Sequence, residues 1–206
     1  MSHGGAAVGV VLAGGGSRRM GRDKARLHLP GGPTLLDHAI ARLRALDLEV
    51  LLAAGERLYD DVSAHVEAVA DGAGVGPAAG ILGAAAARPG RDLLVLAVDL
   101  PLVPVELLAS LCAHRGAWVV PVVAAPELPS GERLQPTCAL YRPPAVAALV
   151  RRIAAGDVSL RGLAREPDLD VVRVEPLDAS SIFANLNTPE EAREAFASLR
   201  QSPHRR

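Results

Sequence analysis

This chain of 206 residues has few aromatic residues and almost no net charge. Two tyrosines, two phenylalanines and one tryptophan are too few and too scattered for a nucleic-acid-binding groove built on base stacking. Lysine and arginine total 22 against 23 aspartates and glutamates, so the formal net charge is −1. This balance excludes a general polyanion binder, and any phosphate chemistry has to rest on a local cluster of cations.

Paired cysteines, clustered histidines and long apolar runs are also missing. Cys112 and Cys138 form no CxxC motif, and the six histidines show no metal-ligand spacing. A zinc site or a disulfide framework is therefore not expected, and a reducing compartment fits best. Residues 1–16 lack the positively charged start of a signal peptide, and the apolar stretch 72–87 is shorter than the roughly 20 residues that span a membrane. We expect a soluble cytoplasmic protein with no membrane or nucleic-acid partner.

Short apolar runs alternate with helical periodicity along the chain. Hydrophobic residues make up 50% and charged residues 22%, a globular composition. The alternation predicts an α/β fold of three layers, a mostly parallel, Rossmann-like central sheet with helices on both faces. The predicted strands are 7–13, 49–54, 66–70, 93–98, 117–123, 137–141 and 170–174. The predicted helices are 58–66, 78–87, 144–154, 160–165 and 189–199, with two more beginning at Thr34 and Pro104, and 124–133 is predicted to be turn-rich.

The length predicts one domain over residues 1–200, followed by a frayed tail over 201–206. Residues 1–115 have the pattern of a doubly wound α/β half. Residues 116–200 are less regular, and we expect them to complete the sheet and to wall a substrate cleft.

The strongest motif is LAGGGSRRMGRDK, over residues 12–24, directly after the first predicted strand. Its three glycines, Gly14, Gly15 and Gly16, let the backbone turn sharply and approach an anion closely. Four cations follow within a few residues: Arg18, Arg19, Arg22 and Lys24. The motif fits neither the dinucleotide pattern GxGxxG nor the Walker pattern GxxxxGK[ST]. It nevertheless predicts a phosphate-binding loop, because an ordinary turn would not carry this density of positive charge.

A single aspartate, Asp99, ends the apolar run LLVLAVD. Ligands of open α/β sheets bind at the carboxyl ends of the strands, where this carboxylate is predicted to lie. A capping role for the helix at Pro104 is the alternative, but Asp99 stands five positions too early. We therefore predict that Asp99 is a Mg²⁺ ligand, since a carboxylate with triphosphate oxygens is ordinary Mg²⁺ coordination.

Near the end of the sequence, FANLNTPEE (183–191) divides into two parts. Thr188, Pro189 and Glu191 have the pattern of a helix start, a capping box with proline at the first helical position. Asn185 and Asn187 have no such local explanation. On an extended segment their side chains point to the same side, where two amides suit a polar heterocycle such as a pterin.

Together, LAGGGSRRMGRDK and FANLNTPEE resemble the opening and closing motifs of the nucleotidyltransferase family that includes molybdenum cofactor guanylyltransferase. The resemblance implies a nucleotidyltransferase fold, with a nucleotide-binding half over 1–115 and a pterin-substrate half over 116–200. It also implies a reaction that transfers GMP from GTP to the phosphate of the molybdenum cofactor (molybdopterin), with Mg²⁺ and release of pyrophosphate. Proteins of cofactor biosynthesis, or molybdoenzymes, are the implied protein partners.

The same resemblance implies roles for individual residues. The backbone at Leu12, Ala13 and Gly14 would lie against the nucleotide, the amides of Gly15 and Gly16 would cradle its phosphates, and Lys24, helped by Arg19, would neutralise them. Asp99 would hold the metal, while Asp71 and the Gly76-Pro77 turn would line the nucleotide site. Asn185 and Asn187 would lie on the pterin side, with Arg161 of the SLR segment.

Two of these positions have equally simple local explanations. Asp71 favours a turn before Gly72, and Arg161 could be a surface residue of its helix. The segment QPTCALY (135–141) is also family-like, although it is weak on its own.

The sequence departs from the family at Ala53 and Ala54, where relatives often carry an asparagine that contacts the nucleotide. This departure leaves the preference for guanine open, so another nucleotidyltransferase, using CTP or acting on a sugar phosphate, is one alternative. A nucleotide-binding partner protein without turnover is the other, although binding alone would not require the Asp99 carboxylate beside Lys24.

Overall fold

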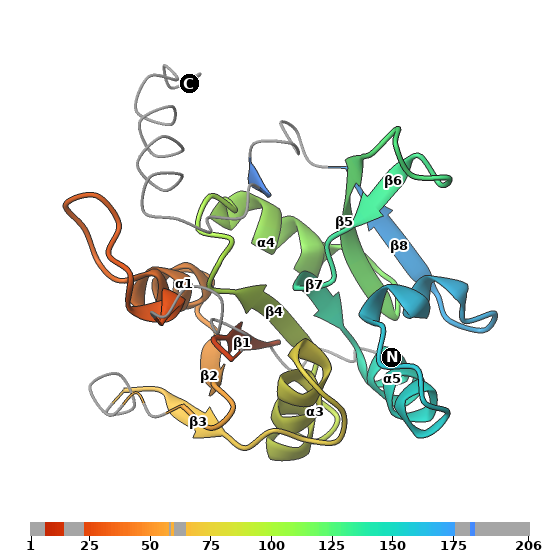
Figure 1. Cartoon of the computed structure of the whole chain (residues 1–206), viewed down its shortest axis with the longest axis horizontal. Coiled ribbons are helices and arrows are strands. Elements are labelled where there is room, and N and C mark those ends of the chain that lie inside the picture. The colour runs from red at the N-terminus through yellow and green to blue at the C-terminus, as the bar shows by residue number, and fades with distance from the viewer. Residues whose placement is uncertain (1–6, 15–22, 58, 60–64, 176–181, 184–206) are drawn as a thin grey trace.

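A computed structural model describes residues 7–14, 23–57, 59, 65–175 and 182–183. Eight strands form one mixed sheet, in the order β3-β2-β1-β4-β7-β5-β6, with β8 paired to β5 (Figure 1). The strands are β1 Val8–Leu12, β2 Glu49–Ala53, β3 Glu67–Val69, β4 Leu93–Ala97, β5 Trp118–Ala124, β6 Glu132–Leu134, β7 Cys138–Tyr141 and β8 Val171–Val174. The expected α/β class, mostly parallel, is confirmed.

Among the described residues, four α-helices cover this sheet. They are α1 Leu35–Arg44, α3 Pro77–Ala87, α4 Val105–Ala113 and α5 Pro143–Ala154. Helices α1 and α4 contact each other on one face, while α3 and α5 contact each other on the other face (Figure 1). Two 3-10 helices, η2 Lys24–Arg26 and η3 Leu160–Arg165, complete the described elements. Thr34 caps α1 as predicted, because its side chain accepts a hydrogen bond from the Asp37 amide.

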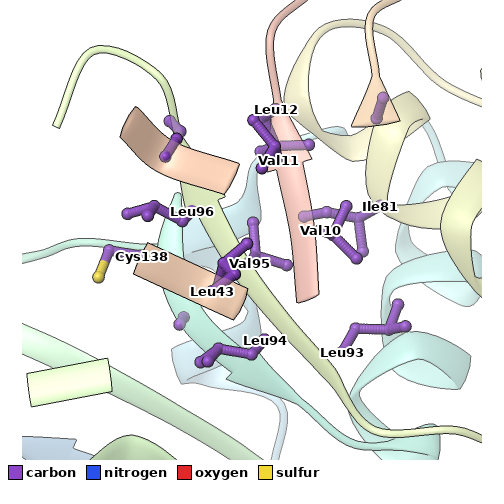
Figure 2. Close-up of a cluster of buried hydrophobic side chains, with 14 of the residues drawn as sticks. Val10, Val11, Leu12, Leu43, Ile81, Leu93, Leu94, Val95, Leu96 and Cys138 are labelled. Atoms are coloured by element: carbon purple, nitrogen blue, oxygen red, sulfur yellow. The ribbon is translucent and has the colours of Figure 1, made fainter. Parts of the chain in front are cut away.

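Apolar side chains on both faces of β1 and β4 form the centre of the core, and every residue of these two strands is buried. Val10 faces Ile81 of α3, whereas Leu43 of α1 lies on the opposite side of the sheet with Leu94 (Figure 2). Continuously apolar strands are what a sheet covered on both faces requires.

The topology differs from a simple parallel sheet at β7. This strand lies between β4 and β5 and is antiparallel to both. Strand β6 starts inside the stretch 124–133 that was predicted to be turn-rich, where Glu132 pairs with Ala124. The segment 160–165 is a 3-10 helix.

Several predicted segments lie outside the described residues: the tail 201–206, the helix 189–199 and most of the helix 58–66. In the described part of the chain, no helix is both long and apolar enough to cross a membrane.

Candidate active site

The chain after β1 is held across the carboxyl ends of its neighbouring strands. The Ala13 and Gly14 amides both donate to the Ala53 carbonyl, at 2.9 and 3.2 Å, and the Val98 amide donates to the Leu12 carbonyl at 3.1 Å. A Cβ on Gly14 would lie 3.2 Å from the Ala54 carbonyl carbon, so only glycine fits without displacement. The Ala13 and Gly14 amides are thus engaged within the sheet.

A cavity of about 460 Å³, the central cleft, opens at this edge of the sheet. Its wall brings together predicted residues from distant parts of the sequence and adds a segment between β6 and β7. The lining residues are Leu12, Ala13, Gly14, Lys24, Gly76, Pro77, Ala97, Val98, Asp99, Gln135, Pro136, Thr137 and Arg161.

Asp99 lies in the turn directly after β4 and is half-buried in the central cleft. Helix α4 takes Pro104 as its N-cap, with no side-chain capping bond, so the capping role considered for Asp99 is wrong. His38 of α1 contacts the chain two residues after Asp99, with its Nε2 3.0 Å from the Pro101 carbonyl oxygen. Burial, followed by the neighbouring Arg42 guanidinium, lowers the pKa of His38.

Lys24 reaches the cleft from the short helix η2, which a polar network ties to the chain after β2. Asp23 caps this helix and forms an ion pair with Arg57 at 2.9 Å. The Arg26 guanidinium stacks 5.3 Å from the centre of the Tyr59 ring. Burial, followed by the Asp23 carboxylate, raises the pKa of Tyr59 to about 12. These contacts fix the position of the Lys24 backbone.

Helix α3 begins at the cleft. Its N-cap, Gly76, has φ +60° and ψ −139°, a backbone conformation open only to glycine, and Pro77 occupies the first helical position. The N-terminus of a helix carries partial positive charge and free amides, so this end of α3 favours an anion in the cleft.

A second cavity of about 460 Å³, the side cavity, adjoins the cleft and shares four lining residues with it. Its lining residues are Leu12, Gly14, Ala53, Ala54, Gly55, Glu56, Arg57, Asp71, Gly76, Pro77 and Gly80. Asp71 is exposed there, and a Cβ on Gly55 would lie 3.4 Å from Asp71 Oδ2. Among the described residues the Asp71 carboxylate makes no bond to the turn at Gly72, whose amide donates to the Ala79 carbonyl instead.

Residues 135–137 form another part of the wall of the central cleft. They were not predicted as site residues from the sequence. The Gln135 amide donates to the Pro121 carbonyl, and the Ala97 amide donates to the Thr137 carbonyl. The fully buried Tyr141 hydroxyl donates to the Pro136 carbonyl at 2.8 Å, and burial raises its pKa. The QPTCALY motif was the sequence signal that could have identified residues 135–137. No sequence signal pointed to Arg57, which lines the side cavity.

Arg161 stands at the rim of the cleft, on η3, and its Nε donates to the Leu134 carbonyl at 3.4 Å. Five predicted site residues lie outside the described part of the chain: Gly15, Gly16, Arg19, Asn185 and Asn187.

Replacing Tyr141 with phenylalanine tests how the 135–137 wall is held. The change removes one buried hydroxyl and leaves the Pro136 carbonyl without its partner. We expect the free energy of unfolding to fall by about 1–2 kcal/mol. Urea denaturation of both proteins measures this difference, and an unchanged midpoint would show that the hydrogen bond contributes nothing.

Gly14, Lys24, Asp99 and the N-terminus of α3 line one cleft at the strand ends of a mixed α/β sheet, which is where α/β proteins bind nucleotides. The protein is of the nucleotidyltransferase class. The chain belongs to the MobA-like NTP transferase family, whose domain profile matches residues 9–198. The match covers every described element from β1 to β8, apart from Val8, the first residue of β1.

Curated relatives match over nearly their whole length. A protein of Chloroflexus aggregans named probable molybdenum cofactor guanylyltransferase is 35% identical over 192 residues, covering 89% of this chain and 90% of the relative. A molybdenum cofactor guanylyltransferase of Shewanella amazonensis is 31% identical over 195 residues, covering 93% and 96%.

Solved structures have the same fold. The molybdopterin-guanine dinucleotide biosynthesis protein A of Archaeoglobus fulgidus superposes with a TM-score of 0.72 at 24% identity, covering 93% of this chain and 98% of that one. The 2-C-methyl-D-erythritol 4-phosphate cytidylyltransferase of Thermus thermophilus also gives 0.72, at 21% identity, covering 94% and 99%.

Proposed function

We propose that this protein transfers GMP from GTP to the phosphate of the molybdenum cofactor (molybdopterin) and releases pyrophosphate. The observation that carries the proposal is the central cleft, where Lys24, Asp99 and the α3 N-terminus line one cavity that has Arg161 at its rim. The names of the curated relatives support the choice of donor and acceptor.

In the proposed reaction an oxygen of the acceptor phosphate attacks the α-phosphorus of GTP, and the bond from that phosphorus to the bridging oxygen of pyrophosphate breaks. The attacking oxygen is already ionised at neutral pH, so no general base is needed. Catalysis then rests on alignment and on charge neutralisation. Lys24 and the N-terminus of α3 offset the charge on the phosphates, and Arg19 is proposed to assist them.

Mg²⁺ is the proposed cofactor, and the donor set fits it. Asp99 supplies a hard carboxylate oxygen at the cleft, and no group of three potential ligand side chains occurs among the described residues. Mg²⁺ binds through one or two carboxylates plus substrate phosphates rather than in an all-protein cage, so Asp99 alone is a plausible protein ligand. When bound, the metal would supply charge stabilisation at the reacting phosphates.

We further propose that residues 1–115 and 116–200 act as the nucleotide and pterin sides of one domain. Asp71 in the side cavity would contact the nucleoside, together with the backbone at Leu12, Ala13 and Gly14. Arg161, Asn185 and Asn187 would contact the pterin substrate. The reaction would take place in the cytoplasm, with cofactor-biosynthesis proteins or molybdoenzymes as partners.

Cytidylyl transfer is the second candidate. Ala53 lines the side cavity where relatives often carry asparagine, and a cytidylyltransferase is among the proteins of similar fold. Thermal unfolding with GTP, CTP and ATP, each with Mg²⁺, separates the candidates. A nucleotide at 100 times its Kd stabilises the fold by about 2.7 kcal/mol. Selective stabilisation by GTP supports guanylyl transfer, selective stabilisation by CTP favours the second candidate, and no response would contradict both.

Lys24 is the single lysine of the chain, whose other basic side chains besides histidine are all arginine. We expect Lys24→Ala to weaken GTP binding roughly 10- to 100-fold, because a charge-assisted bond to phosphate is worth about 1.5–3 kcal/mol. Calorimetric titration with GTP measures the loss, and Arg115→Ala, an exposed cation away from both cavities, is the control. Equal affinity of the two variants would remove Lys24 from the site. GTP should also protect Lys24 from amine-selective labelling.

A further inference from the structure

A third cavity, of about 500 Å³, continues outward from the central cleft. We name it the arginine groove. Arg161 lines both the cleft and the groove, so the two spaces meet at this side chain. The residues of the groove are Leu128, Ser130, Glu132, Arg133, Leu134, Arg161, Ala164, Arg165 and Arg173.

Three separate elements build this groove around β5. Strand β6 pairs with the end of β5 through Val122 and Leu134, while β8 pairs with β5 through Val120 and Arg173 (Figure 1). Helix η3 closes the third side with Arg161 and Arg165. Arg133 and Arg173 therefore come from strands of the sheet, while Arg161 and Arg165 come from η3, which contacts α5, and all four side chains are exposed.

The groove carries excess positive charge. Arg173 Nε lies 3.5 Å from Glu132 Oε2, and Arg133 forms an ion pair with Glu127. Arg161 donates one hydrogen bond to the Leu134 carbonyl, and this bond does not neutralise the charge of the guanidinium group. Among the described residues no carboxylate forms an ion pair with Arg161 or Arg165. Asp157 interacts electrostatically with Arg165 but forms its ion pair with Arg152. Arg161 and Arg165 thus have no ion-pair partner among the described residues, in a chain whose net charge is −1.

Guanidinium groups bind oxyanions through planar, paired donors. In the central cleft, Lys24 and the N-terminus of α3 already serve the reacting phosphates. The arginines of the groove are therefore expected to bind a different anionic group. Because Arg161 lines both spaces, a ligand that extends from the cleft into the groove would contact this side chain.

We propose that the arginine groove holds a second anionic group of the acceptor substrate, remote from its reacting phosphate. This inference rests on the proposed function, in which the acceptor is molybdopterin carrying its metal. The metal-bearing dithiolate end of that molecule is such a group. Arg165 and Arg173 would then be binding residues for the acceptor and would leave GTP binding untouched.

Neutralising the two arginines with glutamine tests the groove. We expect Arg165→Gln to raise the KM for metal-loaded molybdopterin roughly tenfold, and Arg165→Gln combined with Arg173→Gln to raise it further. The KM for GTP and the stabilisation by GTP should match those of Arg115→Gln, which makes the same change of charge as Arg165→Gln but away from the groove. Raising the salt concentration should weaken acceptor binding in the control more than in the double variant.

The outcomes separate this inference from the function on which it rests. Failure of the unmodified protein to guanylylate molybdopterin would overturn the proposed function. Turnover with an acceptor KM that stays equal in the double variant and in Arg115→Gln would overturn the groove alone. A parallel loss of affinity for GTP and for the acceptor would also overturn it, because the effect would not be specific to the acceptor.

Discussion

Replacing Asp99 with asparagine is expected to lower Mg²⁺-dependent turnover by about 10³-fold or more. Asp99 is the carboxylate that lines the central cleft, and it follows the central strand β4 directly. The amide of asparagine keeps the size of the side chain but removes its charge. Several kcal/mol of charge stabilisation would then be lost at the transferring phosphate, and each 1.36 kcal/mol is tenfold in rate.

Steady-state kinetics over a range of Mg²⁺ concentrations measures this loss. Asp168→Asn is the matched control, because Asp168 is exposed in a turn and lines none of the described cavities. Since no bond in the described structure depends on Asp99, we expect the two variants to have the same melting temperature. Full Mg²⁺-dependent turnover in Asp99→Asn would refute the assignment of the metal ligand.

Replacing Gly83 with alanine is expected to destabilise the fold by about 2 kcal/mol or more. In an exposed helix this change would add about 1 kcal/mol of stability, because alanine is the better helix former. Here α3 packs so closely on the chain after β3 that the new Cβ would overlap the Ala70 carbonyl oxygen and lie 3.0 Å from its carbonyl carbon. Backbone cannot move aside as a flexible side chain can, so the overlap outweighs the helix propensity.

Denaturation in urea measures the free energy of unfolding, and Gly32→Ala is the control. A Cβ on Gly32 would meet Leu29 Cβ at 3.4 Å, an ordinary contact. We expect a loss for Gly83→Ala that is clearly larger than for the control. Because α3 carries Gly76 and Pro77 into both cavities, weaker GTP binding should accompany it. A Gly83→Ala protein as stable as the control would contradict the close packing.

Much of the fold could be predicted because its signals are local. The buried strands β1 and β4 are continuous apolar runs, and α1 begins at a capping threonine. The strand-end position of Asp99 follows from the same reading, since a parallel α/β sheet gathers its strand ends at one edge. Strand β6 was not predicted, because its three residues show no clear alternation of apolar and polar side chains. Its pairing with β5 also spans the intervening loop, which no local pattern indicates.

The composition of the site was less accessible. Residues 135–137 enter the cleft because β7 returns antiparallel between β4 and β5, a pairing across some forty residues that no local pattern announces. Arg57 reaches the side cavity through its ion pair with Asp23, again a contact between distant segments. The sequence alone left the Ala13 and Gly14 amides available to a ligand. In the folded chain both amides donate to the Ala53 carbonyl.

The sequence by itself determined the α/β class, most of the described elements and the position of the carboxylate after the central strand. Each of these depends on residues that are neighbours along the chain, through periodicity, capping or backbone freedom. Only the tertiary structure decided the place of β7, the far wall of the cleft and the arginine groove that meets it at Arg161. These depend on strand pairing and packing between remote segments, whose free energy is spread over many weak contacts.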